Sequence, residues 1–371
     1  MNNHTHAAGH SRPPLSTTTP SEIASRLLAA PTSDAPGPVV ITTHAKPDGD
    51  AAGSSLALAR ALIHKGVPAE VWHVGPFQGW LKTIAGDTPT RRISQDTPAA
   101  SLSSALPSDA SNEPRAIVVT DTGSWVQLET LTPWLKPRTQ RVMVIDHHLQ
   151  GDADLSPRRL VETTAASATQ VLAPVIDALL GLRADEALPE PIARMLYLGL
   201  ATDTGWFKFS NTSAAAMRLA ARMIDSGVDH AGLYQLIDQQ DAAVRPRLLG
   251  RALSSLRYFD ENTIAFMALT GGDLRELSAG QEDTGGFAEP AMSVMSVRVV
   301  AVFTDATRAG DAQPTTKVSL RSKPGTNAID VAAVCASLGG GGHARAAGVK
   351  LKMEIPQAQE AVLQALRMKR G

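Results

Sequence analysis

The chain contains very little cysteine: Cys335 is the only one among 371 residues. One thiol per chain excludes an intramolecular disulfide framework, and it excludes any zinc or iron–sulfur site built from several cysteines of one chain. A metal bound by this chain would therefore need histidine and carboxylate ligands. Such sparse use of cysteine is typical of a reducing compartment.

Long apolar runs and an excess of one charge are also missing. No stretch approaches the roughly 18 apolar residues of a transmembrane helix, and residues 1–20 lack the basic-then-apolar order of a signal peptide. The formal net charge is -1, so global charge does not indicate binding to nucleic acid or to a membrane. We therefore expect a cytoplasmic protein without a membrane partner, whose residues 1–20 form a disordered polar tail.

The rest of the chain divides into two parts of different pattern. Residues 21–225 alternate short Val- and Ile-rich runs with helical periodicity, which predicts an α/β catalytic domain with a mostly parallel sheet flanked by helices. Residues 226–255 are charged and helical, as expected of a linker, and residues 256–371 predict a smaller α+β domain. We expect an active-site cleft between the two domains. Residues 86–115, rich in Ser, Thr, Pro and Ala, predict a weakly structured connection with one short helix at its centre.

Three apolar runs, residues 39–43, 117–120 and 142–145, end abruptly in acid or imidazole. We interpret the runs as buried strands of a parallel sheet. Their ends read His44-Ala-Lys-Pro-Asp48-Gly-Asp50, Asp121, and Asp146-His147-His148. Since the carboxyl ends of parallel strands meet at one edge of a sheet, these side chains are expected to converge there. A predicted helix over residues 191–202 ends at Asp203 and can deliver it to the same edge.

The residue types at this edge indicate a pair of divalent cations. His44 and Asp48 can face one cation, and Asp121 can bridge two because a carboxylate has two oxygens. The full predicted ligand set is His44, Asp48, Asp50, Asp121, His147 and Asp203. Carboxylates and imidazoles without thiolates suit Mn²⁺ or Mg²⁺ better than structural zinc, with Co²⁺ as a further candidate. Taken singly, each residue also suits a turn or a helix cap.

Two such ions, roughly 3.5–4 Å apart, can clamp a phosphoryl group and generate a nucleophilic hydroxide. That chemistry hydrolyses phosphoesters or phosphoanhydrides. Asp146 differs from its neighbours, because we expect it to orient the ligand His147 and to hold the loop rather than to bind metal itself.

The motifs HAKPDGD, VVTDTG, VIDHH and ATDTG, in this order, resemble those of the DHH phosphoesterase superfamily. The stretch GGGGHARAAG resembles the signature of the DHH-associated C-terminal domain, so that the likeness covers about residues 38–352. Length and domain pairing most resemble the subgroup of nanoRNases and phosphatases of 3′-phosphoadenosine 5′-phosphate (pAp). The resemblance implies one Mn²⁺ on His44, Asp48 and Asp121, and a second on Asp50, Asp121, His147 and Asp203. It also implies that His148 contacts the scissile phosphate.

The glycine run before His343 is expected to bind substrate. Consecutive glycines let backbone N–H groups approach an anion closely and form a nest, beside which His343 can donate to a phosphate. In the resemblance, Arg321 at a strand end lies over the substrate. Read alone, the run suits a flexible turn and Arg321 a solvated surface charge. The predicted substrate-binding residues are Arg321, Ser322, Gly340, Gly341, Gly342 and His343.

Together these patterns predict a metal-dependent phosphoesterase that hydrolyses short oligonucleotides, pAp or both by two-metal activation of a bridging hydroxide. The catalytic residues would be Asp121, Asp146, His147 and His148. Its partners would be short single-stranded oligonucleotides or a nucleotide 3′,5′-bisphosphate, with a homodimer as a candidate assembly. The motifs do not separate this function from a phosphodiesterase of linear or cyclic dinucleotides. A sensor that binds nucleotides without hydrolysis is a third interpretation, although a pure binder would not need a bridging Asp121.

Overall fold

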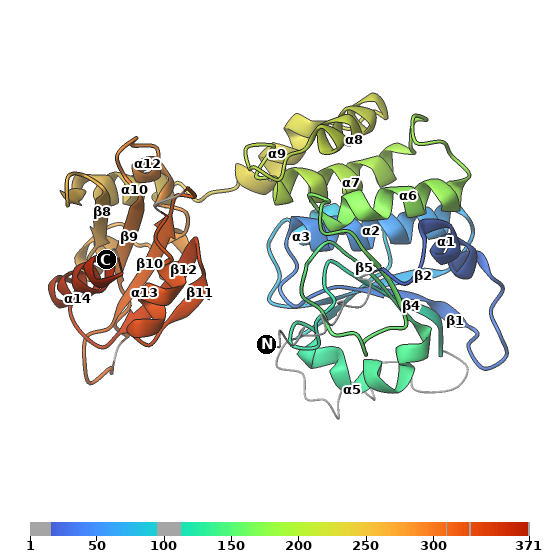
Figure 1. Ribbon diagram of the computed structural model, residues 1–371, viewed down its shortest axis with the longest axis horizontal. Helices are drawn as coiled ribbons and strands as arrows, with labels where there is room; N and C mark the ends of the chain where they lie inside the picture. The colour runs from blue at the N-terminus through green and yellow to red at the C-terminus, as the bar shows by residue number, and fades with distance from the viewer. Residues whose placement is uncertain (1–15, 95–112, 309, 326–327, 370–371) are drawn as a thin grey trace, which may run out of the picture. The chain divides into compact units, whose positions relative to one another are not determined.

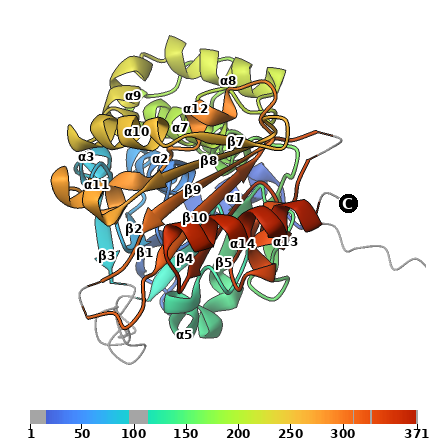
Figure 2. The ribbon, with the colours of Figure 1, turned by 90° about the vertical axis from the view of Figure 1, so that its left-hand side faces the viewer.

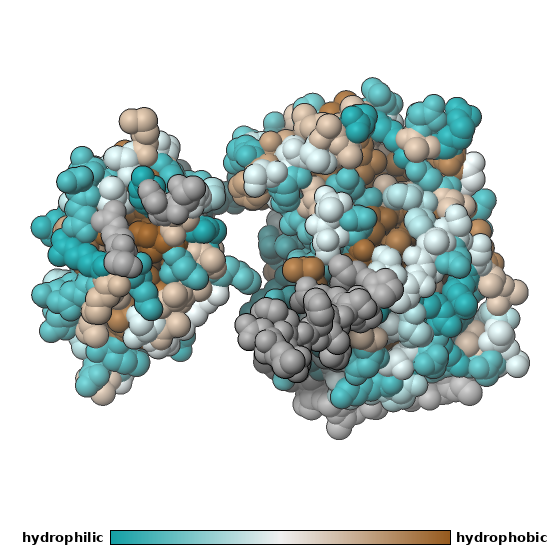
Figure 3. All heavy atoms as spheres, viewed as in Figure 1, coloured by the Kyte–Doolittle hydropathy of each residue, from teal (hydrophilic) through white to brown (hydrophobic). Residues whose placement is uncertain are grey.

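The computed structural model describes residues 16–94, 113–308, 310–325 and 328–369 (Figure 1). The chain divides into two compact units, residues 1–239 and 240–371. Among the described helices, none combines the length and the apolar character needed to cross a membrane. Hydrophilic residues predominate on the face drawn in Figure 3, as expected where most large apolar side chains lie in the cores.

A six-stranded parallel sheet forms the centre of the N-terminal unit, in the order β3-β2-β1-β4-β5-β6. The strands are β1 (Gly37–Thr42), β2 (Ala69–Val74), β3 (Thr90–Ile93), β4 (Pro114–Thr120), β5 (Val142–Asp146) and β6 (Arg158–Val161). The direction of strand progression reverses between β1 and β4. At such a reversal the connections leave on opposite faces, so a crevice opens outside the carboxyl ends of the two strands. The predicted parallel α/β architecture is confirmed.

Helices cover both faces of this sheet (Figure 1). The helices of the unit are α1 (Pro20–Leu28), α2 (Gly49–His64), α3 (Leu81–Ala85), α5 (Thr132–Leu135), α6 (Ala168–Leu180), α7 (Glu190–Asp203), α8 (Ala214–Asp225) and α9 (His230–Asp238). Helices α1, α2, α6 and α7 share one hydrophobic core with the sheet, and α5 belongs to a second core on the other face. Helix α2 is buried along nearly its whole length because it lies between the sheet and α7.

Two glycines allow the backbones of α2 and α7 to touch. A Cβ atom at Gly53 would lie 2.6 Å from the Met195 carbonyl oxygen and 2.9 Å from the Gly199 nitrogen. A Cβ atom at Gly199 would lie 2.4 Å from Oδ1 of Asp50. Side chains at these positions would therefore force the two helices apart. The close approach brings the first turn of α2 beside α7.

The C-terminal unit contains a mixed sheet in the order β11-β12-β10-β9-β8-β7, in which only β8 and β9 pair in parallel. Figure 2 labels β7, β8, β9 and β10 of this sheet. The strands are β7 (Arg257–Phe259), β8 (Ile264–Leu269), β9 (Val299–Asp305), β10 (Thr316–Ser322), β11 (Gly341–His343) and β12 (Ala346–Leu351). The helices are α10 (Val244–Ser254), α11 (Gly271–Glu276), α12 (Glu289–Met292), α13 (Val331–Ser337) and α14 (Ile355–Met368). Helices α13 and α14 pack on one face, and α10, α11 and α12 on the other, which confirms the predicted smaller α+β fold.

Some predictions of local structure differ from the fold. Strand β3 lies in the segment predicted to be weakly structured, because it is short, polar and only partly buried and so shows no apolar run. The predicted short helix at the centre of that segment falls in residues 95–112, outside the described residues. The predicted tail falls outside them for residues 1–15, whereas Thr17 donates its backbone N–H to the Arg159 carbonyl along β6 at 2.7 Å.

The helix contact yields a test of the fold. Gly53→Ala is expected to lower the free energy of unfolding of the N-terminal unit by about 1–3 kcal/mol, because overpacking against backbone atoms has no rotamer that relieves it. Unfolding can be followed by tryptophan fluorescence, since all five tryptophans lie in this unit. Gly250→Ala in α10 of the C-terminal unit is the matched control: a Cβ there meets nothing within 4 Å, so it should leave the unfolding reported by the tryptophans of the N-terminal unit unchanged. Equal stability of Gly53→Ala and wild type would contradict the contact.

Candidate metal centre

The predicted ligands converge at the reversal point of the parallel sheet. His44 follows β1, Asp121 follows β4, and His147 follows β5. Helix α2 begins and helix α7 ends at the same place. Three groups of side chains each bring their ligand atoms within 4.8 Å of one another: His44, Asp48 and Asp121; Asp50, His147 and Asp203; and Asp121, His147 and His148. The structure therefore brings together all six residues predicted to bind metal.

Asp121 lies between two histidines and faces each with a different oxygen. Its Oδ2 is 3.4 Å from Nε2 of His44, and its Oδ1 is 3.5 Å from Nε2 of His147. The side chain is buried, and the residue has a φ of 60°, a left-handed conformation that is costly for a residue with a Cβ. Its N–H donates to the Ile145 carbonyl at 3.0 Å. This backbone bond to β5 holds the strained turn and points the carboxylate into the centre.

The imidazoles of His44 and His147 are oriented by backbone carbonyls. Nδ1 of His44 lies 2.9 Å from the carbonyl oxygen of Ala45, and Nδ1 of His147 lies 3.4 Å from that of Ala165. A carbonyl oxygen can only accept a hydrogen bond, so each contact assigns an N–H to Nδ1. Nε2 is then the atom that loses its proton when the imidazole binds a metal. Both Nε2 atoms face Asp121. The two rings are thus arranged as metal ligands usually are.

Helix termini position the remaining carboxylates. Asp48 caps α2, accepting the N–H groups of Asp50 and Ala51 at 3.1 Å with the oxygen that lies 3.9 Å from Nε2 of His44. Asp50 accepts the N–H groups of Ala168 at 2.5 Å and Thr169 at 3.0 Å, in the first turn of α6. The positive end of that helix favours a buried carboxylate. The helix-cap interpretation of Asp48 and its place in the centre are therefore compatible.

The carboxylates of the centre repel one another strongly. Burial and the charges of Asp121 and Asp203 raise the pKa of Asp50 well above its ordinary value. Burial raises the pKa of Asp203 to about 6. Burial disfavours charged imidazoles at His44 and His147, but the Asp121 carboxylate outweighs it and raises the pKa of each to about 9. Carboxylates crowded in this way gain from any positive charge placed among them.

Two atoms of the centre fit a metal ion in particular. Asp121 Oδ1 and His147 Nε2 are buried, face each other, and have no hydrogen-bond partner among the described residues. Buried polar atoms without a partner are costly, and a divalent cation would satisfy both atoms together. The donors are oxygen and imidazole nitrogen throughout, which suits Mn²⁺ or Mg²⁺. The residues present thus fit a divalent metal.

Asp146 holds a different histidine from the one expected. Its buried Oδ1 accepts the backbone N–H of His147 at 2.8 Å, and it contacts Nδ1 of His148 at 2.8 Å. The imidazole that Asp146 orients is therefore that of His148, because the ring of His147 turns to the Ala165 carbonyl instead. The hydrogen bond that His148 Nδ1–H donates to the Asp146 carboxylate raises the pKa of His148.

A cavity of about 380 Å³ opens beside the centre. It is lined by His44, Ala45, Asp48, Asp121, Val126, Gln127, His148 and Asp203. Val126 and Gln127 lie in a turn without a motif of their own, so the sequence does not mark them as site residues. The side chain of Val126 is 82% exposed, an unusual state for valine beside a polar site. The only feature of the sequence that could have placed them near the centre is their position five and six residues after Asp121.

The predicted substrate-binding residues lie at one end of the C-terminal sheet. Arg321 is exposed and Ser322 is buried at the end of β10. The glycine run forms the edge strand β11, which pairs with β12, rather than the expected anion-binding nest. The physical reason is close packing, since a Cβ at Gly340 or Gly342 would lie 2.4 or 2.6 Å from a β12 carbonyl oxygen. His343 at the end of β11 is exposed.

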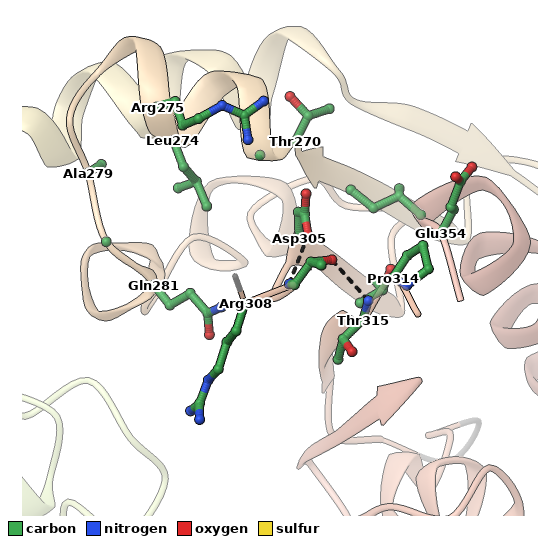
Figure 4. Close-up of a pocket in the computed structure, with 15 residues that line it drawn as sticks. Thr270, Leu274, Arg275, Ala279, Gln281, Asp305, Arg308, Pro314, Thr315 and Glu354 are labelled. Carbon is green, nitrogen blue, oxygen red and sulfur yellow. Dashed lines mark hydrogen bonds between the residues drawn. The ribbon is translucent and has the colours of Figure 1, made fainter. Parts of the chain in front are cut away.

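Another cavity of the C-terminal unit lies at the opposite end of β10 (Figure 4). Its volume is about 810 Å³, and Thr316, the first residue of β10, contributes to its wall. Arg275 and Arg308 line it together with Asp305 and Glu354. It therefore lies apart from Arg321 and His343, and no motif predicted it.

Comparisons with known proteins agree with the motifs. Residues 38–200 match the model of the DHH family, N-terminal domain, and residues 274–368 match that of the DHHA1 domain. The "Bifunctional oligoribonuclease and PAP phosphatase NrnA" of Thermus thermophilus is 31% identical over 92% of this chain and 93% of its own. A "Probable bifunctional oligoribonuclease and PAP phosphatase NrnA" of Streptococcus mutans is 25% identical over 84% and 88%. An exopolyphosphatase-related protein of Bacteroides fragilis has the same fold, with a TM-score of 0.77, 22% identity and coverage of 95% and 96%.

Metal binding should appear as stabilisation of the N-terminal unit. Mn²⁺ or Mg²⁺ at about 100 times its Kd is expected to raise the free energy of unfolding by about 2.7 kcal/mol, because only the folded chain assembles the ligands. Asp121→Asn should lose most of this effect, since it removes the charge shared by both halves of the centre. Thermal unfolding followed by tryptophan fluorescence measures it. Asp225→Asn, an exposed change at the end of α8, is the control and should respond as wild type. Undiminished stabilisation in Asp121→Asn would refute the assignment.

Proposed function

Because the chain belongs to the DHH family, we propose that it hydrolyses short oligonucleotides and pAp in a metal-dependent reaction. One observation carries the proposal: the two oxygens of Asp121 face two histidines, each with a further carboxylate beside it. The relatives named as oligoribonuclease and PAP phosphatase support the substrate class, since they resemble this chain across both units.

We propose that the centre holds two Mn²⁺ ions. His44, Asp48 and Asp121 would bind one of them. Asp50, Asp121, His147 and Asp203 would bind the other. When bound, such ions polarise a phosphoryl oxygen and supply an activated water. The protein contributes orientation: carbonyls hold the two imidazoles and helix termini hold the carboxylates, so that the ligands need little rearrangement.

His148 is proposed to contact the scissile phosphate. Its Nδ1 is engaged by Asp146, so Nε2 is left to donate to an oxygen in the adjoining cavity. The raised pKa of His148 supports this role, because a protonated imidazole forms a charge-assisted hydrogen bond with an anion. Such a contact strengthens as charge develops on the phosphoryl oxygens.

We propose that six residues bind the terminal phosphate of the substrate: Arg321, Ser322, Gly340, Gly341, Gly342 and His343. The exposure of Arg321 and His343 supports this role, since Arg321 spends one donor on the Leu320 carbonyl and keeps others that can reach an anion. An enzyme that grips a chain end is limited to short substrates. The net charge of -1 supports the same limit, because an enzyme of long nucleic acid gains from a strong basic field.

A substrate panel tests the function. It would contain pAp, a dinucleotide, a five-mer, a 24-mer and a cyclic dinucleotide, each tested with Mn²⁺ and after removal of metal. We expect metal-dependent turnover of pAp and the short linear substrates, and a loss of about 10³-fold or more in Asp121→Asn, because the ligands act as a unit. Asp225→Asn should match wild type.

Other outcomes of the panel would redirect the proposal. Preference for the cyclic dinucleotide would identify a dinucleotide phosphodiesterase. Preference for the 24-mer would contradict the limit on length. Tight nucleotide binding without any turnover would leave a sensor as the function.

Asp146 gives a second test through the group that it orients. Asp146→Asn should reduce kcat by about 10–100-fold, as changes that release an oriented histidine commonly do. KM and the stabilisation by Mn²⁺ should change little, because Asp146 belongs to none of the groups whose ligand atoms converge on the centre. Steady-state kinetics and thermal unfolding separate the two effects. Loss of metal stabilisation together with activity would mean that Asp146 supports the metal centre as a whole.

A further inference from the structure

A second pocket of the N-terminal unit lies at the edge of the parallel sheet opposite the metal centre. Its volume is about 220 Å³, and its wall includes Ala116 of β4 and Met143 of β5, close to the first residues of these strands. Strand β4 leads from Ala116 at the pocket to Thr120, directly before the turn at Asp121. At about 3.3 Å per residue, this strand separates the pocket from the metal centre by roughly 16 Å. The two sites are therefore distinct.

The pocket gathers arginines from four separate segments of the chain. They are Arg26 of α1, Arg115 of β4, Arg141 at the end of the turn of helix over Lys136–Arg141, and Arg158 of β6. Four of the ten described lining residues are thus cationic, and none of the ten is an aspartate or glutamate. The cationic groups outnumber anions here far more than in the chain as a whole, whose net charge is -1.

Backbone carbonyls, rather than carboxylates, hold two of these four guanidinium groups. Arg115 donates to the Ala29 carbonyl, and Arg158 donates to the Gln140 carbonyl at 2.6 Å. A carbonyl orients a guanidinium without neutralising its charge. Of the four arginines, only Arg141 forms ion pairs with described residues, with Asp34 at 3.0 Å and Glu113 at 3.0 Å.

Two of the remaining positive charges, those of Arg26 and Arg158, repel each other. Arg115 and Arg158 are partly buried, and burial together with the charge of Arg26 lowers the pKa of Arg158. An anion in the pocket would relieve this repulsion and accept from several donors at once. Guanidinium groups suit phosphate best, because their paired N–H groups match two of its oxygens.

We propose that Arg26, Arg115, Arg141 and Arg158 form a binding site for a phosphate group, separate from the metal centre. The volume is below the roughly 300–1,000 Å³ of pockets that enclose whole ligands, so the phosphate enters and the rest of a larger molecule stays outside. The phosphate is either inorganic phosphate or the terminal group of a nucleotide. Both are products expected from phosphoester hydrolysis, but the site itself does not depend on the proposed function.

The larger cavity of the C-terminal unit offers no comparable match to a ligand. Its wall mixes Arg275 and Arg308 with Asp305 and Glu354, and the Arg308 side chain points away from Asp305 (Figure 4). An anion in this cavity would be attracted by the two arginines and repelled by the two carboxylates. The arginine pocket is the more selective of the two.

Calorimetric titration of the full-length chain tests the site. Metal is first stripped on a chelating resin, because a metal-loaded centre would itself bind phosphate and because a soluble chelator is itself an anion. Arg321→Gln is titrated as well: it removes the phosphate contact proposed for the C-terminal unit and should leave binding at the arginine pocket unchanged. Inorganic phosphate, AMP and adenosine are then titrated at low ionic strength. Arg26→Gln is the principal variant, since Arg26 is exposed and has no hydrogen bond to another described residue. Arg158→Gln is the second variant, and Arg218→Gln, an exposed change on α8, is the matched control.

Wild type should bind phosphate, and Arg26→Gln and Arg158→Gln should each weaken binding by about tenfold or more, as expected for loss of a charged hydrogen bond. Arg218→Gln should stay within about twofold of wild type. AMP binding tighter than phosphate, with adenosine silent, would identify a nucleotide as the source; equal affinities would identify inorganic phosphate. Absence of phosphate binding, or equal binding by wild type and both pocket variants, would overturn the proposal. Hydrolysis of the short substrates should be unchanged in Arg26→Gln, so a failure here is distinct from a failure of the proposed function.

Discussion

Mutual repulsion of carboxylates in a largely buried space is the constraint on which the rest of the N-terminal unit depends. Asp50, Asp121 and Asp203 lie within reach of one imidazole, His147. A different part of the backbone positions each of them. Asp50 accepts from the first turn of α6, Asp121 lies in a strained turn after β4, and Asp203 is the last residue of α7. Such an arrangement is stable only where the scaffold is rigid, and where protons or cations offset the charge.

The topology supplies that rigidity. Reversal of strand order between β1 and β4 opens the crevice, and paired strands fix the spacing of the residues that follow them. The glycine contact between α2 and α7 sets the depth of Asp50 relative to the sheet. Strand order, strand pairing and the helix contact are all properties of the backbone. The positions of the side chains in the centre are therefore set by the fold rather than by contacts among those side chains.

The sequence was most informative where residue type and position reinforced each other. Apolar runs that end in Asp or His located the strands β1, β4 and β5 and the edge where the ligands meet, because both signals are local. Strand β6 was missed, since its four residues are only partly buried and show no apolar run. The imidazole that contacts Asp146 was also predicted wrongly. The choice between His147 and His148 depends on how their rings are oriented, and the His147 ring is oriented by the Ala165 carbonyl, 18 residues further along the chain. The arginine pocket could not be predicted, since its members come from four segments without a shared motif.

The wide spacing of the ligands along the chain has a consequence for folding. His44 and Asp203 stand near the two ends of the catalytic part of the sequence, and the centre is incomplete until both have arrived. Contacts between such distant residues require closure of long loops, which slows folding. A nascent chain therefore has no high-affinity site to offer while it is being synthesised, and loading with metal becomes a late event that follows completion of the fold. A chain that carries metal at this centre has therefore already folded its N-terminal unit.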